Sequence, residues 1–482
     1  MPSASGARLA GDDFQHFFTW LHALRLLRER DRLTKIEFEV DDAGNVDDLV
    51  IHRQAGPPIY HQIKFARDQR ALITSEWFMT PLRSGGKSLL QQFHESSRRL
   101  SRDGVPPEMA LFTNRQIAGD EAIFACLDGQ TDKLTPRLRA ATSGSGAGRA
   151  LAAWAEHLRV SEEELLTLLD HLEVKAGMAS LDELRESCAV LAEAVGLRGD
   201  LDAMDLGCAE IRRRIIEGCR ELDAEAVREI VREKALTAEA RRGSLLIQGI
   251  ARHPFPEAAT ASVDWVALYE GNEARERRQV HDPGAWQQMR EELHEAVERI
   301  RGEGHSDVLV DGAFRLSTAF LAGVELADVA GFSAAIRTRE HGLWETSADA
   351  ANVSIETTRH ELDRGNDLAI GLSITGDLSA DVLSYIESAG LPVSAFVNLS
   401  PTDGSGRRAL AGPEEARGLA DAAFDEIREL TRDVAGTVHL FQFGPVGAAL
   451  LLGHLWNRVP TTRLYDDLGP GRGYTPTFLL PA

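Results

Sequence analysis

The N-terminal residues follow a helical pattern first and a strand pattern afterwards. Apolar side chains recur at helical spacing over residues 12–30, which predicts an amphipathic first helix capped by Asp12 or Asp13. Runs rich in β-branched and aromatic residues predict strands at 35–40, 47–53, 59–65 and 109–113. Helices are expected at about 72–80 and 86–102. These elements predict an α/β domain over residues 1–120.

The next part of the chain is rich in Ala, Leu, Glu and Arg and poor in strand formers. Its pattern predicts helices at about 148–158, 162–174, 180–195, 208–221 and 223–236. We therefore expect residues 121–285 to form a helical connector, and we find no catalytic constellation in it.

Three strand–turn–helix units mark the C-terminal region, residues 286–482. They lie at 306–323, 367–388 and 437–456, each with a buried apolar strand and a turn of small residues. Such units build a parallel, Rossmann-like sheet, and ligands bind at the carboxyl ends of its strands. None of the turns is a GxGxxG or Walker sequence, which argues against ordinary NAD or ATP chemistry.

Composition and charge narrow the class of protein. The net charge of −22 argues against a general nucleic-acid coat. The four cysteines show no metal-finger spacing, which favours a reducing compartment. Since no signal pattern and no long apolar run is present, we expect a cytoplasmic protein without a membrane span.

Candidate chemistry lies on the strand pair Val46–Phe65. Asp47 and Asp48 open the first strand, and Gln62 and Lys64 share one face of the second. Carboxylates can hold a hard cation such as Mg²⁺ through oxygen, and a lysine can stabilise charge that develops on a phosphate. The pattern therefore suits metal-dependent phosphodiester cleavage.

A local excess of basic residues follows this strand pair. The stretch 64–102 carries eight Lys or Arg and three acids, a net charge of 8 − 3 = +5. Such a stretch suits a phosphate backbone. The candidate DNA contacts within it are Arg67, Arg70, Arg83 and Lys87.

The strand pair resembles the PD-(D/E)xK nuclease superfamily in its Gln-x-Lys variant. The resemblance implies a restriction-endonuclease-like fold and a catalytic triad of Asp47, Gln62 and Lys64, with Asp48 as the alternative to Asp47. It also implies Mg²⁺ or Mn²⁺ as cofactor. The implied ligands are Asp47, Asp48 and Gln62, with Glu39 as a further oxygen donor and Asp12 or Gln15 as others from the first helix.

The C-terminal region resembles the SAVED domain, a sensor made of two CARF-like halves. The resemblance rests on FQFGPVGAALLLGHLW, then the strand TRLYDD, then YTPTFLL. It implies a CBASS antiphage effector in which a cyclic di- or trinucleotide binds the sensor. The sensors then self-associate, and the nuclease domains cut double-stranded DNA without sequence choice.

The candidate sensor contacts follow from their positions at the three turns. Arg315 and Ser317 follow the first strand, and Trp344 and Tyr474 are candidates for stacking on bases. The second and third turns contribute Ser373, Thr375, Gly376, Phe443, Gly444 and Pro445. Two other functions stay open from the sequence, namely a modification-dependent restriction endonuclease and a catalytically inactive nucleotide-sensing scaffold.

Overall fold

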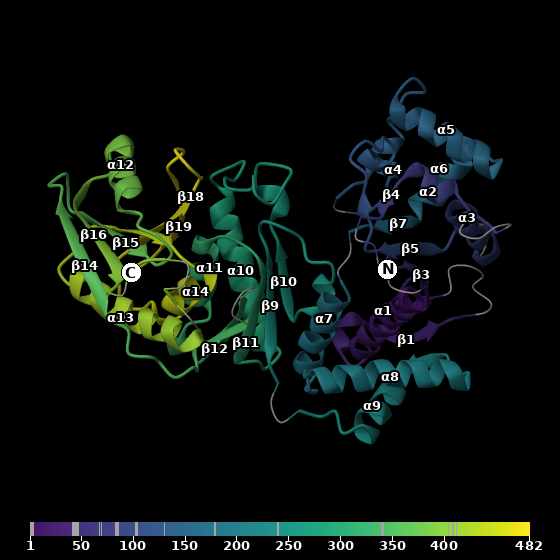
Figure 1. Ribbon diagram of the computed structural model, residues 1–482, viewed down its shortest axis with the longest axis horizontal. Coiled ribbons are helices and arrows are strands. Elements are labelled where there is room, and N and C mark those ends of the chain that lie inside the picture. The colour runs from purple at the N-terminus through teal and green to yellow at the C-terminus, as the bar shows by residue number, and fades with distance from the viewer. Residues whose placement is uncertain are drawn as a thin grey trace. The chain divides into compact units, whose positions relative to one another are not determined.

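A computed structural model of the chain shows two compact units, Met1–Glu239 and Ala240–Ala482 (Figure 1). It describes residues 4–40, 48–66, 68, 70–81, 86–101, 105–129, 131–177, 180–238, 241–338, 342–402, 404–406, 409–410 and 412–482, with side chains from residue 11 onward. The three domains expected from the sequence are thus replaced by two units, and the expected connector at 121–285 is divided between them.

The first unit is built on a mixed sheet of six described strands in the order β7-β5-β3-β2-β1-β8. Strands β3, β5 and β7 are parallel, whereas β1 is antiparallel to both β2 and β8, and β2 is antiparallel to β3. The strands are β1 (Leu33–Phe38), β2 (Leu49–Arg53), β3 (Ile59–Lys64), β5 (Glu108–Thr113), β7 (Leu172–Lys175) and β8 (Glu221–Asp223). A separate pair consists of β4 (Leu72–Ile73) and β6 (Gln116–Ile117).

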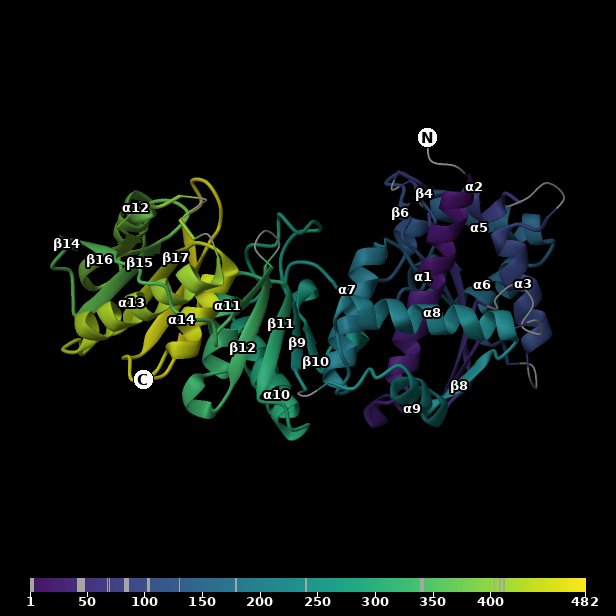
Figure 2. The same cartoon turned by 60° about the horizontal axis from the view of Figure 1, so that its bottom comes forward.

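Helices cover both faces of this sheet (Figure 2). On one face α1 packs on the aromatic side chains of β3 and β5, and α7 and α8 pack on α1. On the other face α2, α3, α5 and α6 share a core with Met109 and Leu111. The helices are α1 (Ala4–Arg25), α2 (Ser75–Met79), α3 (Leu89–Leu100), α4 (Thr135–Leu138), α5 (Gly146–Leu158), α6 (Glu162–Asp170), α7 (Leu181–Ala194), α8 (Leu201–Glu217) and α9 (Ala224–Glu233). The 3₁₀ turns are η1 (Glu29–Asp31) and η3 (Phe124–Cys126).

The expected helical connector therefore does not form a separate part. The helix expected at 162–174 ends at Asp170, and the residues after it form β7, which pairs with β5. Strand β8 likewise lies beside β1. These two short strands add an edge to each side of the sheet, so the residues expected to be a connector complete the first unit.

The second unit contains two sheets. The first has the order β10-β9-β11-β12-β13 and the second β14-β16-β15-β17-β18-β19, with β13, β14 and β19 antiparallel to their neighbours. The first sheet comprises β9 (Gly243–Gln248), β10 (Ala261–Asp264), β11 (Asp307–Ala313), β12 (Ser333–Thr338) and β13 (Gly342–Glu345). The second comprises β14 (Ile355–Glu361), β15 (Asp367–Ser373), β16 (Val393–Pro401), β17 (Val438–Phe443), β18 (Thr462–Asp467) and β19 (Tyr474–Leu480).

The three expected strand–turn–helix units are confirmed as β11–α11, β15–α12 and β17–α14. The helices are α10 (Ala285–Gly302), α11 (Leu316–Glu325), α12 (Ser379–Ala389), α13 (Pro413–Thr431) and α14 (Val446–Leu455), and the 3₁₀ turns are η4 (Pro256–Ala258), η5 (Val266–Leu268) and η6 (Asp328–Ala330). Strands β9 and β10, which precede the expected boundary at residue 286, also belong to the first sheet of this unit.

Helices α11 and α14 join the two halves of the second unit. A methyl group at Gly323 would lie 2.2 Å from the carbonyl oxygen of Leu450, and one at Gly453 would lie 2.1 Å from that of Phe320. Only glycine allows the two helix backbones to approach this closely. The packed helices belong to one hydrophobic core that includes strands of both sheets.

Candidate functional site

The first candidate site lies where β2 and β3 of the first unit pair. Leu49 is opposite His61 in this antiparallel ladder, so the preceding residue, Asp48, is opposite Gln62. Residues two apart on a strand share a face, which brings Lys64 to the same side. The register thus places an acid, an amide and a lysine together.

The carboxylate of Asp48 is the centre of this cluster. Its Oδ2 accepts hydrogen bonds from the Nε2 of Gln62 and, at 2.6 Å, from the backbone amide of Ile63. The Nζ of Lys64 lies 3.9 Å from the same oxygen. Gln62 is only 3% exposed, whereas Asp48 and Lys64 are partly open to solvent.

Two neighbouring contacts fix the strand end that carries Lys64. The amide of Asn114 accepts from the backbone N–H of Ala66 at 2.6 Å and donates to the carbonyl of the same residue at 2.5 Å. The ring of Phe14 on α1 stacks on Phe65 with centroids 4.9 Å apart. Asn114 was not expected from the sequence, and its position directly after a buried strand was the signal for it.

The structure describes some of the other residues expected at this site. Asp47 lies outside the described residues. Glu39 is exposed, has a left-handed φ of 48°, and approaches Asp48 through its backbone amide, 3.5 Å from the carbonyl oxygen. Gln15 is half-buried on α1.

The oxygen atoms at this site suit a hard divalent cation. The carboxylate of Asp48 and the amide oxygen of Gln62 are ligand types that Mg²⁺ and Mn²⁺ prefer. As the hydrogen bonds stand, Gln62 presents its NH₂ group to Asp48. Rotation of the amide would present its oxygen instead, so the residues fit a metal only after that rotation.

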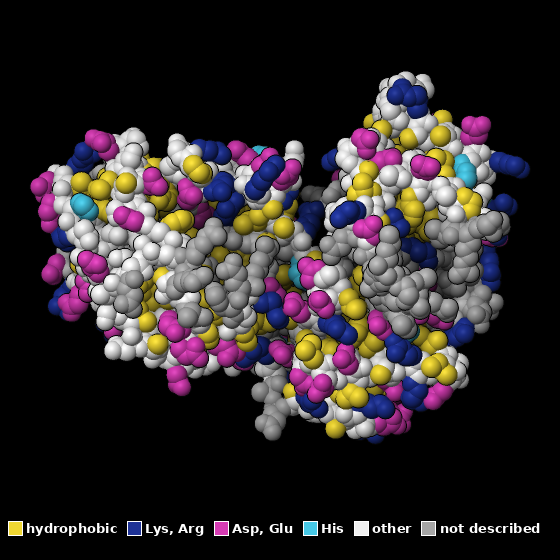
Figure 3. All heavy atoms as spheres, viewed as in Figure 1, with side chains coloured by type: hydrophobic (Ala, Val, Ile, Leu, Met, Phe, Trp, Pro, Cys, Tyr) yellow, Lys and Arg dark blue, Asp and Glu magenta, His cyan; other side chains and the backbone are white. Residues whose placement is uncertain are grey.

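The expected basic surface is described only in part. Arg67 and Arg83 lie outside the described residues, and Arg70 is exposed. Lys87 forms an ion pair with Glu95, one of the three acids of the stretch. On the face shown in Figure 3, basic and acidic side chains are interspersed over the visible surface of each unit.

The second candidate site is a cleft of about 860 Å³ in the second unit. Its walls come from residues at the carboxyl ends of parallel strands in both sheets, as expected for a ligand site in an α/β fold. The lining residues are Ile250, Ala251, Ala274, Arg275, Gly312, Ala313, Phe314, Arg337, Thr338, Trp344, Ile374, Thr375, Gly406, Leu410, Phe443, Pro445 and Val446.

The cleft combines an exposed aromatic ring with two guanidinium groups. Phe443 is 44% exposed and supplies a face on which a base can stack. Arg337 lines the cleft and pairs with Asp311, with 3.3 Å between Nε and Oδ2. Arg275 is largely exposed and pairs with Glu273. Arg337 was not predicted as a contact, because the strand Ser333–Thr338 was not predicted from the sequence.

Several expected sensor residues line the cleft or lie close to it. Thr375, Phe443 and Pro445 are part of its wall. A methyl group at Gly376 would meet the Phe443 ring at 2.6 Å, and one at Gly444 would meet Ile374 at 2.8 Å. Gly376 and Gly444 therefore lie directly beside the cleft.

Other expected contacts are buried in the protein itself. The Ser373 hydroxyl donates to Asn398 at 2.9 Å and accepts from the amide of Leu378. The ring of Trp344 is 0% exposed and packs where a methyl group at Gly447 would clash, so it offers no free face to a base. Ser373 is thus held by contacts within the protein, and Trp344 belongs to the cleft wall with its ring buried, so a ligand contact of either residue stays a prediction.

Arg315, Ser317 and Tyr474 also have contacts within the protein. The guanidinium of Arg315 donates to the carbonyl of Arg277, with 3.0 Å from Nε, and burial lowers its pKa. Ser317 is buried against Asp466. Tyr474 packs on Tyr385 and lines a different pocket. The ligand contacts expected of these three side chains stay predictions.

The comparisons with known proteins bear on the second unit. Residues 289–480 match the family model described as the SMODS-associated and fused to various effectors sensor domain, SAVED. The second unit therefore contains a SAVED sensor domain. Within the described residues, every helix is too short or too polar to cross a membrane.

Similar proteins cover nearly the whole chain. CD-NTase-associated protein 4 of Enterobacter hormaechei subsp. hoffmannii (strain UCI 50) is 23% identical over 498 residues, 95% of each chain. The Acinetobacter baumannii Cap4 SAVED/CARF-domain containing receptor with 3'3'3'-cAAA is 15% identical, with a TM-score of 0.45 and coverage of 98% of this chain and 99% of that one. The Moraxella osloensis Cap4 receptor is also 15% identical over the same shares, with a TM-score of 0.42.

Proposed function

We propose that this chain is a CBASS effector that binds a cyclic oligonucleotide in the cleft of its SAVED domain and cleaves double-stranded DNA at the Asp48 cluster. One observation carries the nuclease part, namely that Asp48, Gln62 and Lys64 come together at a strand pair in a chain with a SAVED sensor. The name of the Enterobacter relative associates that protein with a CD-NTase, an enzyme class that would supply the messenger here.

The cleft has the chemistry that a cyclic oligonucleotide requires. The exposed face of Phe443 suits a base, and the guanidinium of Arg337 suits a phosphate in a bidentate arrangement. Binding of a phosphate to Arg337 would compete with its ion pair to Asp311. This exchange is favourable when the phosphate accepts more hydrogen bonds from the guanidinium than the carboxylate of Asp311 does.

At the Asp48 cluster the chain's own residues position the scissile phosphate and stabilise its charge. A bound Mg²⁺ or Mn²⁺ would polarise that phosphate and lower the pKa of a bound water. The Nζ of Lys64 is directed toward the Asp48 carboxylate and is part-exposed, so it is placed to stabilise the negative charge of the transition state. Asp48 would hold the cation together with the rotated amide of Gln62.

Self-association would connect the two activities. The protein carries a net charge of −22, so one copy alone attracts DNA weakly. Several copies held together would present several nuclease sites and several small basic surfaces to one duplex. A messenger that binds the assembled state more tightly shifts the population toward it.

The test is degradation of a plasmid by the full chain with Mg²⁺ or Mn²⁺, with and without a panel of cyclic nucleotides. The panel contains cyclic dinucleotides together with 3'3'3'-cAAA and 2'3'3'-cAAA. We expect cutting only with a messenger, together with a larger sedimentation coefficient. Cutting without any nucleotide would favour a modification-dependent restriction enzyme, and binding without cutting would favour a catalytically inactive sensor.

A further inference from the structure

A third group of side chains lies where α8 packs on α1 in the first unit. The two helices approach closely because residue 207 is a glycine: a methyl group there would lie 2.2 Å from the indole of Trp20. The next residue, Cys208, is only 6% exposed and lies against the middle of α1. The close approach thus brings a thiol to that part of the helix.

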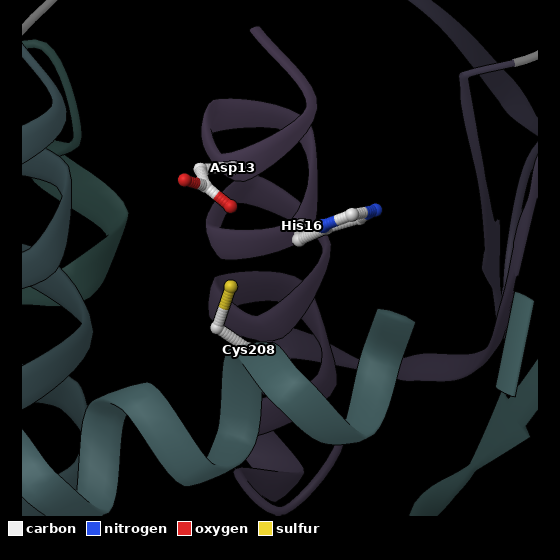
Figure 4. A group of neighbouring side chains, drawn as sticks. All are labelled: Asp13, His16 and Cys208. Atoms are coloured by element: carbon white, nitrogen blue, oxygen red, sulfur yellow. The ribbon is translucent and has the colours of Figure 1, made fainter. Parts of the chain in front are cut away.

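Two side chains of α1 meet this thiol. Asp13 and His16 are three residues apart and therefore share a face of the helix. One ligand atom from each of Asp13, His16 and Cys208 lies within 4.8 Å of the other two. Figure 4 shows an oxygen of Asp13 and the sulfur of Cys208 directed toward each other, with His16 to one side and its ring extending away from them.

The imidazole of His16 provides a second, independent indication of a metal site. His16 is 8% exposed, and within the described residues its Nδ1 has no hydrogen-bond partner. Burial lowers the pKa of this histidine, which favours its neutral form. A buried ring nitrogen without a partner is costly, and a metal ion is a partner that uses the lone pair of a neutral imidazole.

We propose that Asp13, His16 and Cys208 bind Zn²⁺, with water as the fourth ligand. Thiolate and imidazole ligands favour zinc over Mg²⁺, so this site and the Asp48 cluster would take different metals. Tetrahedral zinc separates its ligand atoms by about 3.5 Å, so the three side chains would close by about 1 Å on binding.

Two groups at the site, the Cys208 thiol and the Arg212 guanidinium, affect the free energy of metal binding. Burial raises the pKa of the Cys208 thiol to about 12, so zinc must displace one proton from sulfur as the metal–sulfur bond forms. Arg212 forms an ion pair with Oδ1 of Asp13, which leaves Oδ2 for the metal. The bound ion would join the N-terminal helix to α8 and so stabilise the unit that holds the Asp48 cluster.

The test is titration of the full chain with Co²⁺, which reports a thiolate ligand through a sulfur-to-cobalt charge-transfer band. We expect the band, with release of one proton per ion. Cys208→Ser should remove the band, and His16→Gln should weaken Co²⁺ binding by more than about tenfold. Cys219→Ser, which changes an exposed cysteine, and Asp48→Ala should both retain the band.

Two outcomes would overturn the proposal. One is the absence of a thiolate band in the unaltered chain, and the other is a band that survives Cys208→Ser and disappears in Cys219→Ser. If Cys208→Ser does not fold, Asp13→Asn replaces it as the test variant. Zn²⁺ should then raise the melting temperature of the unaltered chain more than that of Asp13→Asn, and equal shifts would contradict the proposal.

Discussion

The carboxylate of Asp466 caps the first turn of α11 through Ser317. Its Oδ2 accepts from the Ser317 hydroxyl at 2.7 Å, and its Oδ1 accepts from the backbone amide of the same residue at 3.1 Å. Asp466 lies in β18, near the end of a strand in the second half of the sensor, whereas α11 belongs to the first half. The helix N-terminus that could have received a ligand phosphate is therefore occupied by a carboxylate of the protein.

Asp466→Ala should destabilise the second unit. The substitution leaves the buried Ser317 hydroxyl and the helix amide without their acceptor, which costs about 1–3 kcal/mol. The matched control is Asp467→Ala, because Asp467 is exposed and its ion pair with Arg278 is worth less than about 1 kcal/mol. Urea denaturation of the full chain measures both, and equal losses would show that the Ser317 contact contributes little.

Lys64→Ala should reduce DNA cutting by at least about 100-fold, because a charge aimed at the transition state is lost. Lys35→Ala is a matched control: Lys35 lies on β1 of the same sheet, in ion pairs with Glu37 and Glu221. Plasmid degradation measures activity, and messenger binding shows that the sensor still folds. Full activity of Lys64→Ala would remove the Asp48 cluster from the proposed chemistry.

Gln62→Glu should retain metal-dependent cutting, whereas Gln62→Leu should lose it. Glutamate presents oxygen in either orientation of its carboxylate, so the rotation required of the Gln62 amide is no longer needed. Leucine keeps the volume but supplies no ligand atom. Cutting is compared across Mg²⁺ and Mn²⁺ concentrations, and Gln62→Leu with normal metal dependence would show that the amide takes no part in metal binding.

Arg337→Gln should weaken messenger binding, while Arg315→Gln should not. Arg337 lines the cleft, but the Arg315 guanidinium is bound to the carbonyl of Arg277. Loss of a charge-assisted contact worth about 1.5–3 kcal/mol corresponds to roughly 10- to 150-fold in affinity. Calorimetric titration measures both, and a greater loss in Arg315→Gln would move the phosphate site to the first turn.

Acid should destabilise the first unit through the buried histidine His61. Burial lowers the pKa of His61 to about 3, so the folded chain does not take up the proton that the unfolded chain binds below pH 6.5. The contribution of His61 is complete above pH 6.5 and falls by about 1.4 kcal/mol per pH unit below it, toward pH 3. Burial lowers the pKa of His22 in the same direction.

His61→Phe should remove part of this pH dependence, because phenylalanine binds no proton in either state. Hydrogen exchange of the β3 amides at pH 7.5, 6.5 and 5.5, corrected for intrinsic rates, measures the local stability. The unaltered chain should lose protection between pH 6.5 and 5.5, and the variant should lose less. The same loss in both would show that His61 does not control the response.

The patterns of apolar residues predicted the elements that carry the chemistry. The strand pair that brings Asp48 to Gln62, and the three strand–turn–helix units of the sensor, were visible because their alternation or length is distinct. The short strands β7 and β10 were missed because four residues give too little periodicity. Strand β9 was also missed, although its residues are all buried.

The contacts between side chains that are distant in the chain could not be predicted from the sequence. Position at a turn suggested Arg315 and Ser317, but their partners, Arg277 and Asp466, are distant in the chain. The sequence could not decide between a packed and an exposed Trp344, because the pairing of β13 with β12 determines its burial. Arg337 is a candidate only because the cleft lies at the end of β12, which the sequence pattern did not predict.

The glycine contact between α11 and α14 determines how the cleft can respond to a ligand. Backbone atoms of the two helices touch at Gly323 and Gly453, and close-packed backbones do not slide past each other without a large energetic cost. This crossing therefore acts as a fixed pivot, and the strand ends on either side of it can change their separation only by rotation about that point. A small rotation of one half would produce its largest displacement at the rim of the cleft, farthest from the glycines.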